Sequence, residues 1–310
     1  MAAQIYYSLI IPHYNIPQLL ERLLRTIPER EDLQIIVVDD CSPTEIQIQL
    51  RRLQNIFPGV EFYSTGSNGG GGKARNIGLE HALGKYVLFA DADDYFTPGI
   101  SNILDEGHKK DCDLIFFQAI SLDSESYQLS DRGNELNYWI KLCEKKHERG
   151  CKKLRYVFGE PWCKLIKHST IRNHSIKFDE TSCHNDTRFS YLVGHYSATV
   201  SIIPIVGYVV SFRVNSVIQT NFSNRYQIVA DVFCEKERFF LINHIKEQCS
   251  ALYVPLVLDL FHGKFNDFSI KYRFLRQKKG KFSIVMMIGL YFVKVSLYKL
   301  TGKKYFGLIH

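Results

Sequence analysis

The chain has 310 residues, of which 45% are apolar and 13% aromatic, so it can build one large domain with an appendage or two modest domains. This composition excludes a disordered chain. The net charge of +7 suits a partner that carries phosphate, which includes nucleic acids, nucleotides and anionic membrane surfaces.

The first 120 residues alternate short β-branched runs with helical patterns, which predicts a parallel sheet covered by helices on both faces. The expected fold class is therefore α/β. We expect strands at residues 7–11, 34–38, 60–63, 86–90 and 114–119, and helices at 18–26, 43–55 and 72–83.

The second half of the chain has a weaker pattern. Residues 122–150 are polar and charged, and we expect an excursion there with a helix at 135–146. A helix from Pro161, a turn at 173–178, a helix after His184 and strands at 199–203 and 207–213 follow. Residues 224–246 are expected to form a further helix.

The tail changes character. Lys278, Lys279 and Lys281 precede an uncharged apolar run at 282–293, and further lysines follow it. A spanning helix needs about 20 apolar residues, so this run favours an interfacial anchor with its lysines on anionic headgroups. The alternative is a buried helix that packs on the domain.

The eight cysteines include no Cys-x-x-Cys pair, so neither a zinc ribbon nor a thioredoxin-like dithiol is indicated, and the histidines show no metal-ligand spacing. The N-terminus lacks the pattern of a secretory signal. We therefore expect a reduced, cytoplasmic protein. The basic residues lie mainly in the tail beside apolar runs, so a nucleic-acid partner is not expected.

Three of the expected strands end in polar residues, at 12–15, 39–42 and 91–94. In an open α/β sheet, ligands bind beyond the carboxyl ends of the strands. The carboxylates of Asp91, Asp93 and Asp94 repel one another unless a cation or hydrogen-bond donors offset their charge. Oxygen ligands suit Mg²⁺ or Mn²⁺, which keep open positions for a diphosphate. A solvated acidic turn with Asp capping a helix is the alternative.

A glycine-rich segment, Asn68 to Asn76, lacks the residues of a P-loop, because Ser67 stands where Gly is needed and Ala74 where Ser or Thr is needed. It opens a helix and allows close backbone approach to a ligand, and Lys73 and Arg75 could face phosphate. A flexible turn with solvated cations is the alternative.

The order of four motifs resembles family-2 glycosyltransferases with the GT-A fold: Ile-Ile-Pro-His-Tyr-Asn at 10–15, Val-Val-Asp-Asp-Cys-Ser at 37–42, Ala-Arg-Asn at 74–76 and Phe-Ala-Asp-Ala-Asp-Asp at 89–94. The strong resemblance covers roughly residues 5–120 and a weaker one continues to about residue 220. It implies a Rossmann-like, mixed, mostly parallel sheet flanked by helices.

The resemblance also implies domains and donor-site roles. Residues 1–220 would form the GT-A domain, with a nucleotide-sugar half at 1–120 and an acceptor half at 121–220, and 221–310 a helical C-terminal extension. Asp91 and Asp93 would be the metal-binding DXD pair, with Asp93 the direct ligand. The nucleotide-sugar site would comprise Pro12, Tyr14, Asn15, Asp39, Asp40, Lys73, Arg75, Asp91, Ala92 and Asp93, with either Asp39 or Asp40 accepting a hydrogen bond from the base, commonly uracil.

The family uses a carboxylate of its second half as general base, usually in a Glu-Asp pair that opens a helix. The matching stretch here is His184-Asn185-Asp186, so Asp186 is the implied base and Asn185 departs from the usual Glu. A helix cap is the alternative for Asp186. Trp162, His184 and Asn185 are the candidate acceptor-binding residues, although Trp162 could equally belong to the core.

The resemblance therefore implies an inverting, metal-dependent transfer of a sugar, commonly from a UDP-sugar, to a hydroxyl of a glycan or lipid-linked acceptor at the inner face of the cell membrane. A degenerate family member that binds a glycan or a partner is the alternative, because Asn185 replaces Glu. A sugar nucleotidyltransferase fits less well, since His13-Tyr14-Asn15 stands where that class has a Gly-rich loop.

Overall fold

The computed structural model describes residues 4–212, 222–247, 250–279 and 281–301. The chain forms two compact units, Met1–Val214 and Asn215–His310. The domain boundary predicted at residue 220 lies outside the described residues.

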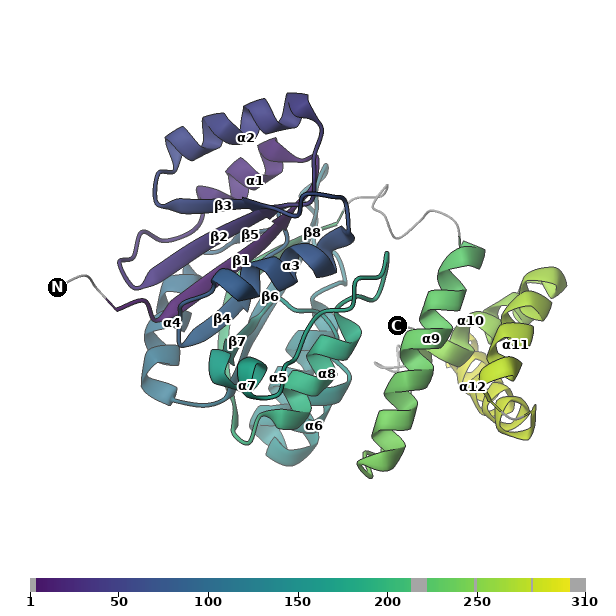
Figure 1. Ribbon diagram of the computed structural model, residues 1–310. Coiled ribbons are helices and arrows are strands. Elements are labelled where there is room, and N and C mark those ends of the chain that lie inside the picture. The colour runs from purple at the N-terminus through teal and green to yellow at the C-terminus, as the bar shows by residue number, and fades with distance from the viewer. Residues whose placement is uncertain (1–3, 213–221, 248–249, 280, 302–310) are drawn as a thin grey trace. The chain divides into compact units, whose positions relative to one another are not determined.

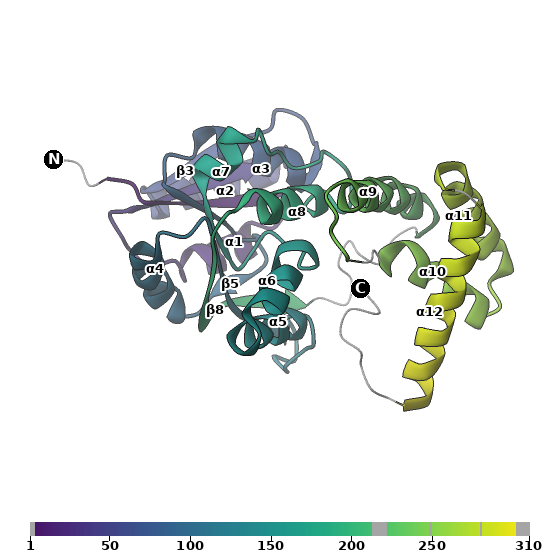
Figure 2. The ribbon, with the colours of Figure 1, turned by 90° about the horizontal axis from the view of Figure 1, so that it is seen from below.

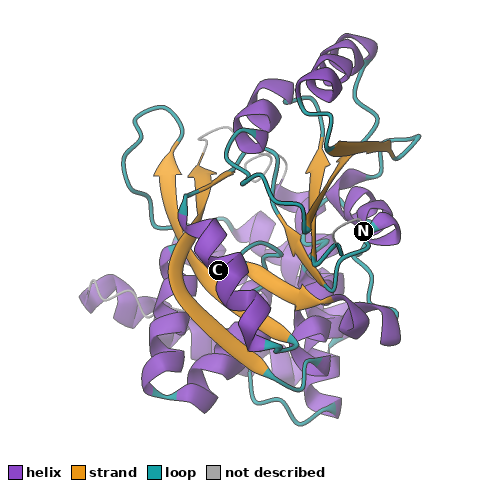
Figure 3. Cartoon of the chain, turned by 90° about the vertical axis from the view of Figure 1, so that its left-hand side faces the viewer, coloured by secondary structure: helices purple, strands orange, loops and turns teal. Residues whose placement is uncertain are grey.

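The first unit is built on a curled sheet with helices on both faces (Figure 3). Within the described residues the sheet has eight strands in the order β3-β2-β1-β4-β7-β6-β8-β5. Strands β5 and β7 are antiparallel to their neighbours and the other pairs are parallel, which confirms the mixed, mostly parallel sheet. The strands are β1 Tyr7–His13, β2 Leu33–Asp39, β3 Val60–Ser64, β4 Tyr86–Phe89, β5 Tyr95–Phe96, β6 Leu114–Asp123, β7 Lys164–Lys167 and β8 Val200–Phe212.

The central strands form because their apolar runs can be buried on both faces. Ile10 and Ile11 of β1 and Val37 of β2 are fully buried. Helix α3 contacts β1, β2 and β3 and lies in front of them in Figure 1. The helices of this unit are α1 Pro17–Leu24, α2 Thr44–Ile56, α3 Gly70–His81, α4 Gly99–Lys110, α5 Asn134–Lys145, α6 His147–Tyr156, α7 His168–Asn173 and α8 Thr187–Tyr196.

The structure corrects the prediction in the second half. The helix predicted from Pro161 is wrong, because residues 164–167 form strand β7 and α7 follows. Lys164 hides this strand from the apolar pattern, yet its ammonium group is buried and donates hydrogen bonds to the Phe158 carbonyl and Ser190 Oγ. The two strands predicted at 199–213 are the single strand β8, which shows register shifts against β6.

The second unit is helical in its described part, with α9 Phe222–Ile242, α10 Ser250–Phe261, α11 Phe265–Lys278 and α12 Lys281–Thr301. Helix α10 contacts each of the other three (Figure 2). The buried pair Lys271–Asp259, at 2.5 Å, joins α11 to α10. Among the described helices, none has the length and apolar content needed to cross a membrane.

Candidate active site

The polar ends of β1, β2 and β4 meet at one edge of the sheet. His13 pairs in register with Asp39, and Ile10 pairs with Phe89, so β4 ends level with the middle of β1. The Asp40 N–H donates to the His13 carbonyl at 2.8 Å. The strand ends that the sequence singled out therefore lie together, as parallel strands require.

Asp39 is held by the strand ends themselves. It is buried, and its carboxylate accepts hydrogen bonds from His13 Nδ1 at 2.8 Å, from the Ser42 hydroxyl at 2.6 Å and from the Ser42 N–H at 2.9 Å. His13 Nε2 accepts the Ile16 N–H at 3.2 Å, so the Nδ1 proton points at Asp39. Burial raises the pKa of Asp39, but these hydrogen bonds outweigh burial and the pKa is lowered.

Asp40 holds the glycine-rich segment. Its carboxylate accepts the N–H groups of Gly69 at 2.9 Å and Gly70 at 2.6 Å, and the Thr65 hydroxyl at 3.0 Å. Two of the backbone donors at the start of α3 are therefore used inside the protein. Lys73 bends back to Ser67 Oγ at 2.7 Å.

The loop after β1 presents two of the predicted donor-site residues. Tyr14 is 47% exposed, and the Asn15 N–H donates to Ser42 Oγ at 3.0 Å with Asn15 in the left-handed region, φ 59°. Pro12 is the sixth residue of β1 and pairs with Val38. An exposed aromatic ring at this edge is available to a ligand.

The acidic cluster divides into a buried member and two that are partly accessible. Asp94 is buried and accepts the Tyr208 hydroxyl at 2.9 Å and the Ser211 N–H at 2.7 Å. Burial, followed by the charges of Asp91 and Asp93, raises the pKa of Asp94 well above its usual range. Tyr208 also accepts the Asp91 N–H at 2.9 Å, so it joins β8 to the cluster. Ala92, between the two carboxylates, is buried.

Arg75 connects the two halves of the domain. Its guanidinium donates to Asp91 Oδ1 at 2.6 Å and to Asn185 Oδ1 at 3.1 Å, and lies 5.4 Å from the centre of the Phe178 ring. Asn76, in the next position of α3, exchanges two hydrogen bonds with the Phe178 backbone, at 2.8 and 3.0 Å. Asn76 belongs to the Ala-Arg-Asn motif at 74–76, but no role was predicted for it from the sequence.

Glycine at position 72 is required by close packing. A Cβ atom there would lie 2.0 Å from the Asp179 carbonyl oxygen and 3.1 Å from the Asn185 Cβ. The start of α3 therefore lies against the 178–185 segment of the second half. The sequence predicted close approach of a ligand to this backbone. At Gly72 the group that approaches closely is the Asp179 carbonyl of the protein itself.

The contact between the start of α3 and residues 178–185 is called the joint below. Asp186 lies beside this joint and directly precedes α8. It occupies the N-cap position, but its side chain makes no cap hydrogen bond, which removes the helix-cap interpretation. Among the described residues no donor binds its carboxylate, and burial raises its pKa while the nearby Arg75 lowers it to a smaller extent. Glu160, which sequence reasoning missed, adds a smaller raising effect. His184, in the left-handed region at φ 55°, lies close enough to act on the same group.

Trp162 does not fit its predicted acceptor role. The ring is 1% exposed and stacks on Tyr208 with centroids 5.7 Å apart, while Phe158 contacts its edge. No face is left for a sugar, so the core interpretation fits the structure. Its stacking partner Tyr208 donates to Asp94, so Trp162 packs against a residue that holds the acidic cluster.

The accessible carboxylates fit a divalent cation. Asp91 and Asp93 flank a buried residue, and one oxygen of Asp91 is outside the Arg75 ion pair. After burial, the charges of Asp91 and Asp93 are the next causes that raise the pKa of Asp94. Mg²⁺ and Mn²⁺ bind at such places through one or two carboxylates together with phosphate oxygens.

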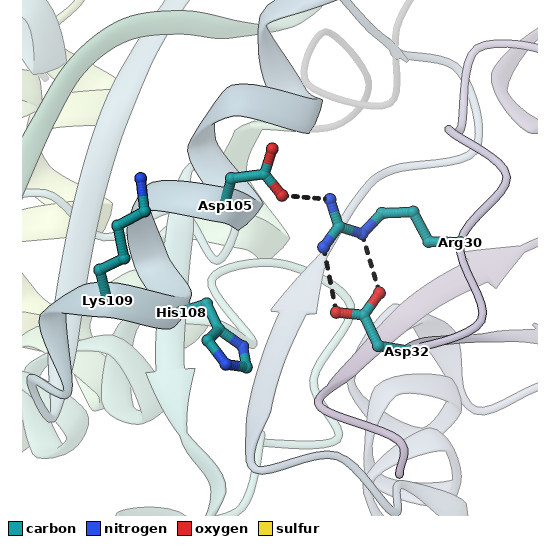
Figure 4. A pocket seen from close by; sticks show the side chains of 5 residues that line it. All are labelled: Arg30, Asp32, Asp105, His108 and Lys109. Atoms are coloured by element: carbon teal, nitrogen blue, oxygen red, sulfur yellow. Dashed lines mark hydrogen bonds and ion pairs between the residues drawn. The ribbon is translucent and has the colours of Figure 1, made fainter. Parts of the chain in front are cut away.

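A charged pocket lies at the opposite, amino edge of the sheet (Figure 4). Arg30, just before β2, donates to both oxygens of Asp32, at 2.8 and 3.0 Å, and to Asp105 at 2.7 Å. His108 and Lys109 of α4 complete its lining. Its central cation is already paired with two carboxylates, so we do not assign the reaction to this pocket.

A mixed α/β sheet with an acidic cluster at its carboxyl edge, and the Asp186 carboxylate nearby, fits the architecture of a glycosyltransferase. Comparison with known proteins agrees: residues 8–174 match the model of glycosyl transferase family 2, and the chain belongs to this family. The resemblance in the four motifs is thereby confirmed, as are the enzyme class and the GT-A type of fold.

Curated relatives share the first half most clearly. The minor teichoic acid biosynthesis protein GgaB of Bacillus subtilis is 33% identical over 182 residues, which are 56% of this chain and 19% of GgaB. The poly(ribitol-phosphate) beta-N-acetylglucosaminyltransferase TarS of Staphylococcus aureus is 36% identical over 96 residues, 29% of this chain and 17% of TarS. The aligned segments thus span about a fifth of the length of these relatives.

Solved structures share the fold at lower identity. S. aureus TarS 1–349 in complex with UDP-GlcNAc matches with a TM-score of 0.59 and 20% identity, over 75% of this chain and 66% of that one. The mannosyltransferase PcManGT from Pyrobaculum calidifontis, in complex with GDP-Man and Mn²⁺, matches with a TM-score of 0.55 and 14% identity, over 98% and 82%.

Proposed function

We propose that this chain transfers a hexose-type sugar from a UDP-sugar to a hydroxyl of a cell-surface glycan polymer, in one inverting displacement with Asp186 as general base. The observation that carries the proposal is the Asp186 carboxylate, which has no hydrogen-bond donor among the described residues and lies near the Arg75–Asp91 ion pair. A base must be free to accept a proton from its substrate.

The residues around the joint would have separate roles in the reaction. Asp186 would take the acceptor proton as the hydroxyl attacks the anomeric carbon, and its raised pKa makes the carboxylate a stronger base than an ordinary aspartate. Arg75 would face the diphosphate from the donor side. Asp91 and Asp93 would hold a Mg²⁺ or Mn²⁺ ion, which would neutralise the charge that develops on the leaving nucleoside diphosphate.

The choice of donor and acceptor rests on the relatives. TarS is named for a poly(ribitol-phosphate) acceptor and is solved with UDP-GlcNAc, and GgaB is named for teichoic acid biosynthesis. These names support a UDP-sugar donor and a phosphate-containing wall polymer as acceptor for this chain. The net charge of +7 suits an anionic polymer.

The direct test is a panel of UDP, GDP, CDP and dTDP sugars with Mn²⁺ or Mg²⁺, with and without EDTA, scored by released nucleoside diphosphate and by thermal shift. We expect EDTA-sensitive release from a UDP-sugar, and Asp93→Ala should weaken metal-dependent donor binding. Donor binding without product, for every acceptor tried, would favour the second candidate, a degenerate family member that binds glycan. The observation behind that candidate is Asn185, whose amide oxygen accepts from Arg75 where the family usually has Glu.

We also propose that α12 contacts the cytoplasmic face of the cell membrane. Ile284 and Tyr291 are buried, whereas Val285, Met286 and Val293 are each more than half exposed and Leu290 and Phe292 are 41% exposed. An exposed apolar face, in a stretch of sequence that also contains Lys281, Lys294 and Lys299, suits an anionic bilayer surface. The double substitution Met286→Glu with Val293→Glu should abolish sedimentation with anionic vesicles, while Leu129→Glu, at a more exposed leucine of the first unit, should not. Equal sedimentation of both variants would refute this.

A further inference from the structure

Three metal-ligating side chains gather where α5 meets α6, outside the active site. Cys143 lies in the last turn of α5, His147 is the first residue of α6, and Cys151 follows one turn later. The candidate ligand atoms all lie within 4.8 Å of one another. Both cysteines are buried and His147 is exposed. The mechanism proposed above uses none of the three.

The spacing within the cluster matches a tetrahedral site. His147 Nδ1 is 3.7 Å from Cys143 Sγ and 3.7 Å from Cys151 Sγ. Zinc–sulfur and zinc–nitrogen bonds of about 2.3 and 2.1 Å at a tetrahedral angle place sulfur and nitrogen ligands about 3.6 Å apart. Both sulfur–nitrogen separations therefore match those around a zinc ion, and the two buried sulfurs lie within 4.8 Å of each other.

The backbone explains why the three side chains converge. Lys146 alone separates α5 from α6, so the chain turns sharply. A Cβ atom at Gly150 would lie 2.1 Å from the Cys143 nitrogen, so only glycine allows this contact between the helices. The resulting Cys-x₃-His-x₃-Cys spacing spans the junction between two helices. A search of the sequence for Cys-x-x-Cys pairs does not detect this spacing.

We propose that Cys143, His147 and Cys151 bind a Zn²⁺ ion, with water as the fourth ligand on the exposed side of His147. The ion clamps α6 to α5. Helix α6 in turn supports α8, because Arg155 donates to the Gly194 carbonyl at 2.7 Å and the Ser197 carbonyl at 2.6 Å. Helix α8 begins directly after Asp186, so the zinc site stabilises the scaffold of the candidate base without touching substrate.

The competing interpretation is a disulfide between Cys143 and Cys151, which would leave His147 without a role. The two proposals differ in chemistry. Zinc requires both thiolates and the imidazole, and loading displaces the thiol protons into solvent. A disulfide requires an oxidant and no histidine.

The test uses the full chain with any affinity tag removed, purified under reducing conditions and stripped with a chelator. We then titrate it with Co²⁺ as a spectroscopic substitute for Zn²⁺. The expected result is one equivalent that shows thiolate-to-cobalt charge-transfer bands and the visible bands of a tetrahedral site, displaced by Zn²⁺. His147→Ala, which alters an exposed side chain, and Cys151→Ser should lose these bands, and Cys112→Ser, at a thiol outside the cluster, should keep them.

Thermal unfolding supplies an independent measurement. Zn²⁺ should raise the melting temperature of the wild type and Cys112→Ser but not that of His147→Ala, because only a ligand that binds the folded state stabilises it. Cobalt bound without thiolate bands would report binding at carboxylates such as Asp91 and Asp93 and would overturn the proposal. A Cys143–Cys151 disulfide found by mass spectrometry in protein purified without reductant, together with no zinc uptake after reduction, would overturn it as well.

Discussion

Replacing Asp186 by Asn tests the base assignment with little change in shape. The wild-type carboxylate accepts no hydrogen bond among the described residues, so the amide leaves no buried donor of the protein unpaired. The substitution removes the ability to take a proton and also one negative charge near Arg75. The loss of activity should therefore approach the full contribution of general-base catalysis, roughly 10²- to 10⁴-fold in kcat, or about 3–5 kcal/mol.

The same substitution should not lower the stability of the folded protein, although it lowers the activity. Burial raises the pKa of Asp186, so the folded protein holds this proton more tightly than the unfolded chain. Its contribution to stability is complete below the unfolded pKa of about 3.9 and is lost as the pH rises through the higher folded pKa. Asparagine cannot ionise, so Asp186→Asn should be at least as stable as the wild type at neutral pH, with a difference that grows above about pH 4.

The assay is product formation from the donor that the panel identifies, followed as a function of pH, with nucleotide affinity measured by calorimetry. The wild-type rate should rise with pH along an acidic limb that lies above the usual aspartate range, and the variant should lack that limb. Nucleotide affinity should stay within about twofold. The matched control is Asp111→Asn, because Asp111 pairs with Lys85 at the other edge of the sheet. Wild-type turnover by Asp186→Asn, or a clear loss of its stability, would refute the assignment.

Three further substitutions test the joint around Arg75. Gly72→Ala should lower kcat/KM by about 10²-fold, because the new Cβ would lie 2.0 Å from the Asp179 carbonyl oxygen and would displace the segment before Asp186. In the same rate assay, the control Gly59→Ala should be neutral, because no atom lies within 4 Å of the position of its Cβ. Tyr208→Phe should cost about 1–3 kcal/mol in urea unfolding, since the Asp91 N–H and the buried Asp94 lose their shared partner; an unchanged midpoint would contradict this. Asn185→Glu should move the acidic limb of the rate profile to higher pH, because a new carboxylate beside Asp186 raises its pKa, and a fixed limb would show that the two side chains do not interact.

Much of the sheet could be predicted because its strands are long apolar runs that end in polar residues. Residues 7–11 and 34–38 were predicted within β1 and β2, and the structure brings their polar ends together. Strand β5 has two residues and β7 has four, including a buried lysine, so neither shows a periodic pattern. Such short strands are fixed by their partners in the sheet, which a local pattern does not contain.

The site residues divide along the same line. Asp91 and Asp93 were proposed because closely spaced carboxylates after a strand repel one another unless a cation or hydrogen-bond donors offset their charge. Trp162 was left open between the acceptor site and the core, because a single aromatic residue in a sequence does not reveal whether its ring faces solvent or Tyr208. Glu160 belongs to no recognisable motif, and only the fold brings its charge close enough to raise the pKa of Asp186. The cysteine cluster depends on a one-residue turn between α5, which was predicted as a helix at 135–146, and α6, which was not predicted.

The glycine-rich segment shows how the two halves depend on each other. Its first N–H groups bind Asp40, and Gly72 admits the Asp179 carbonyl, so the segment uses its backbone for packing between the halves. Arg75, one turn further along α3, then contacts Asp91 of the donor half and Asn185 beside the candidate base. Arg75 therefore links the acidic cluster to the segment that leads to Asp186. If Asp91 and Asp186 act as proposed, this link would help to hold the donor and the acceptor in line for a single displacement.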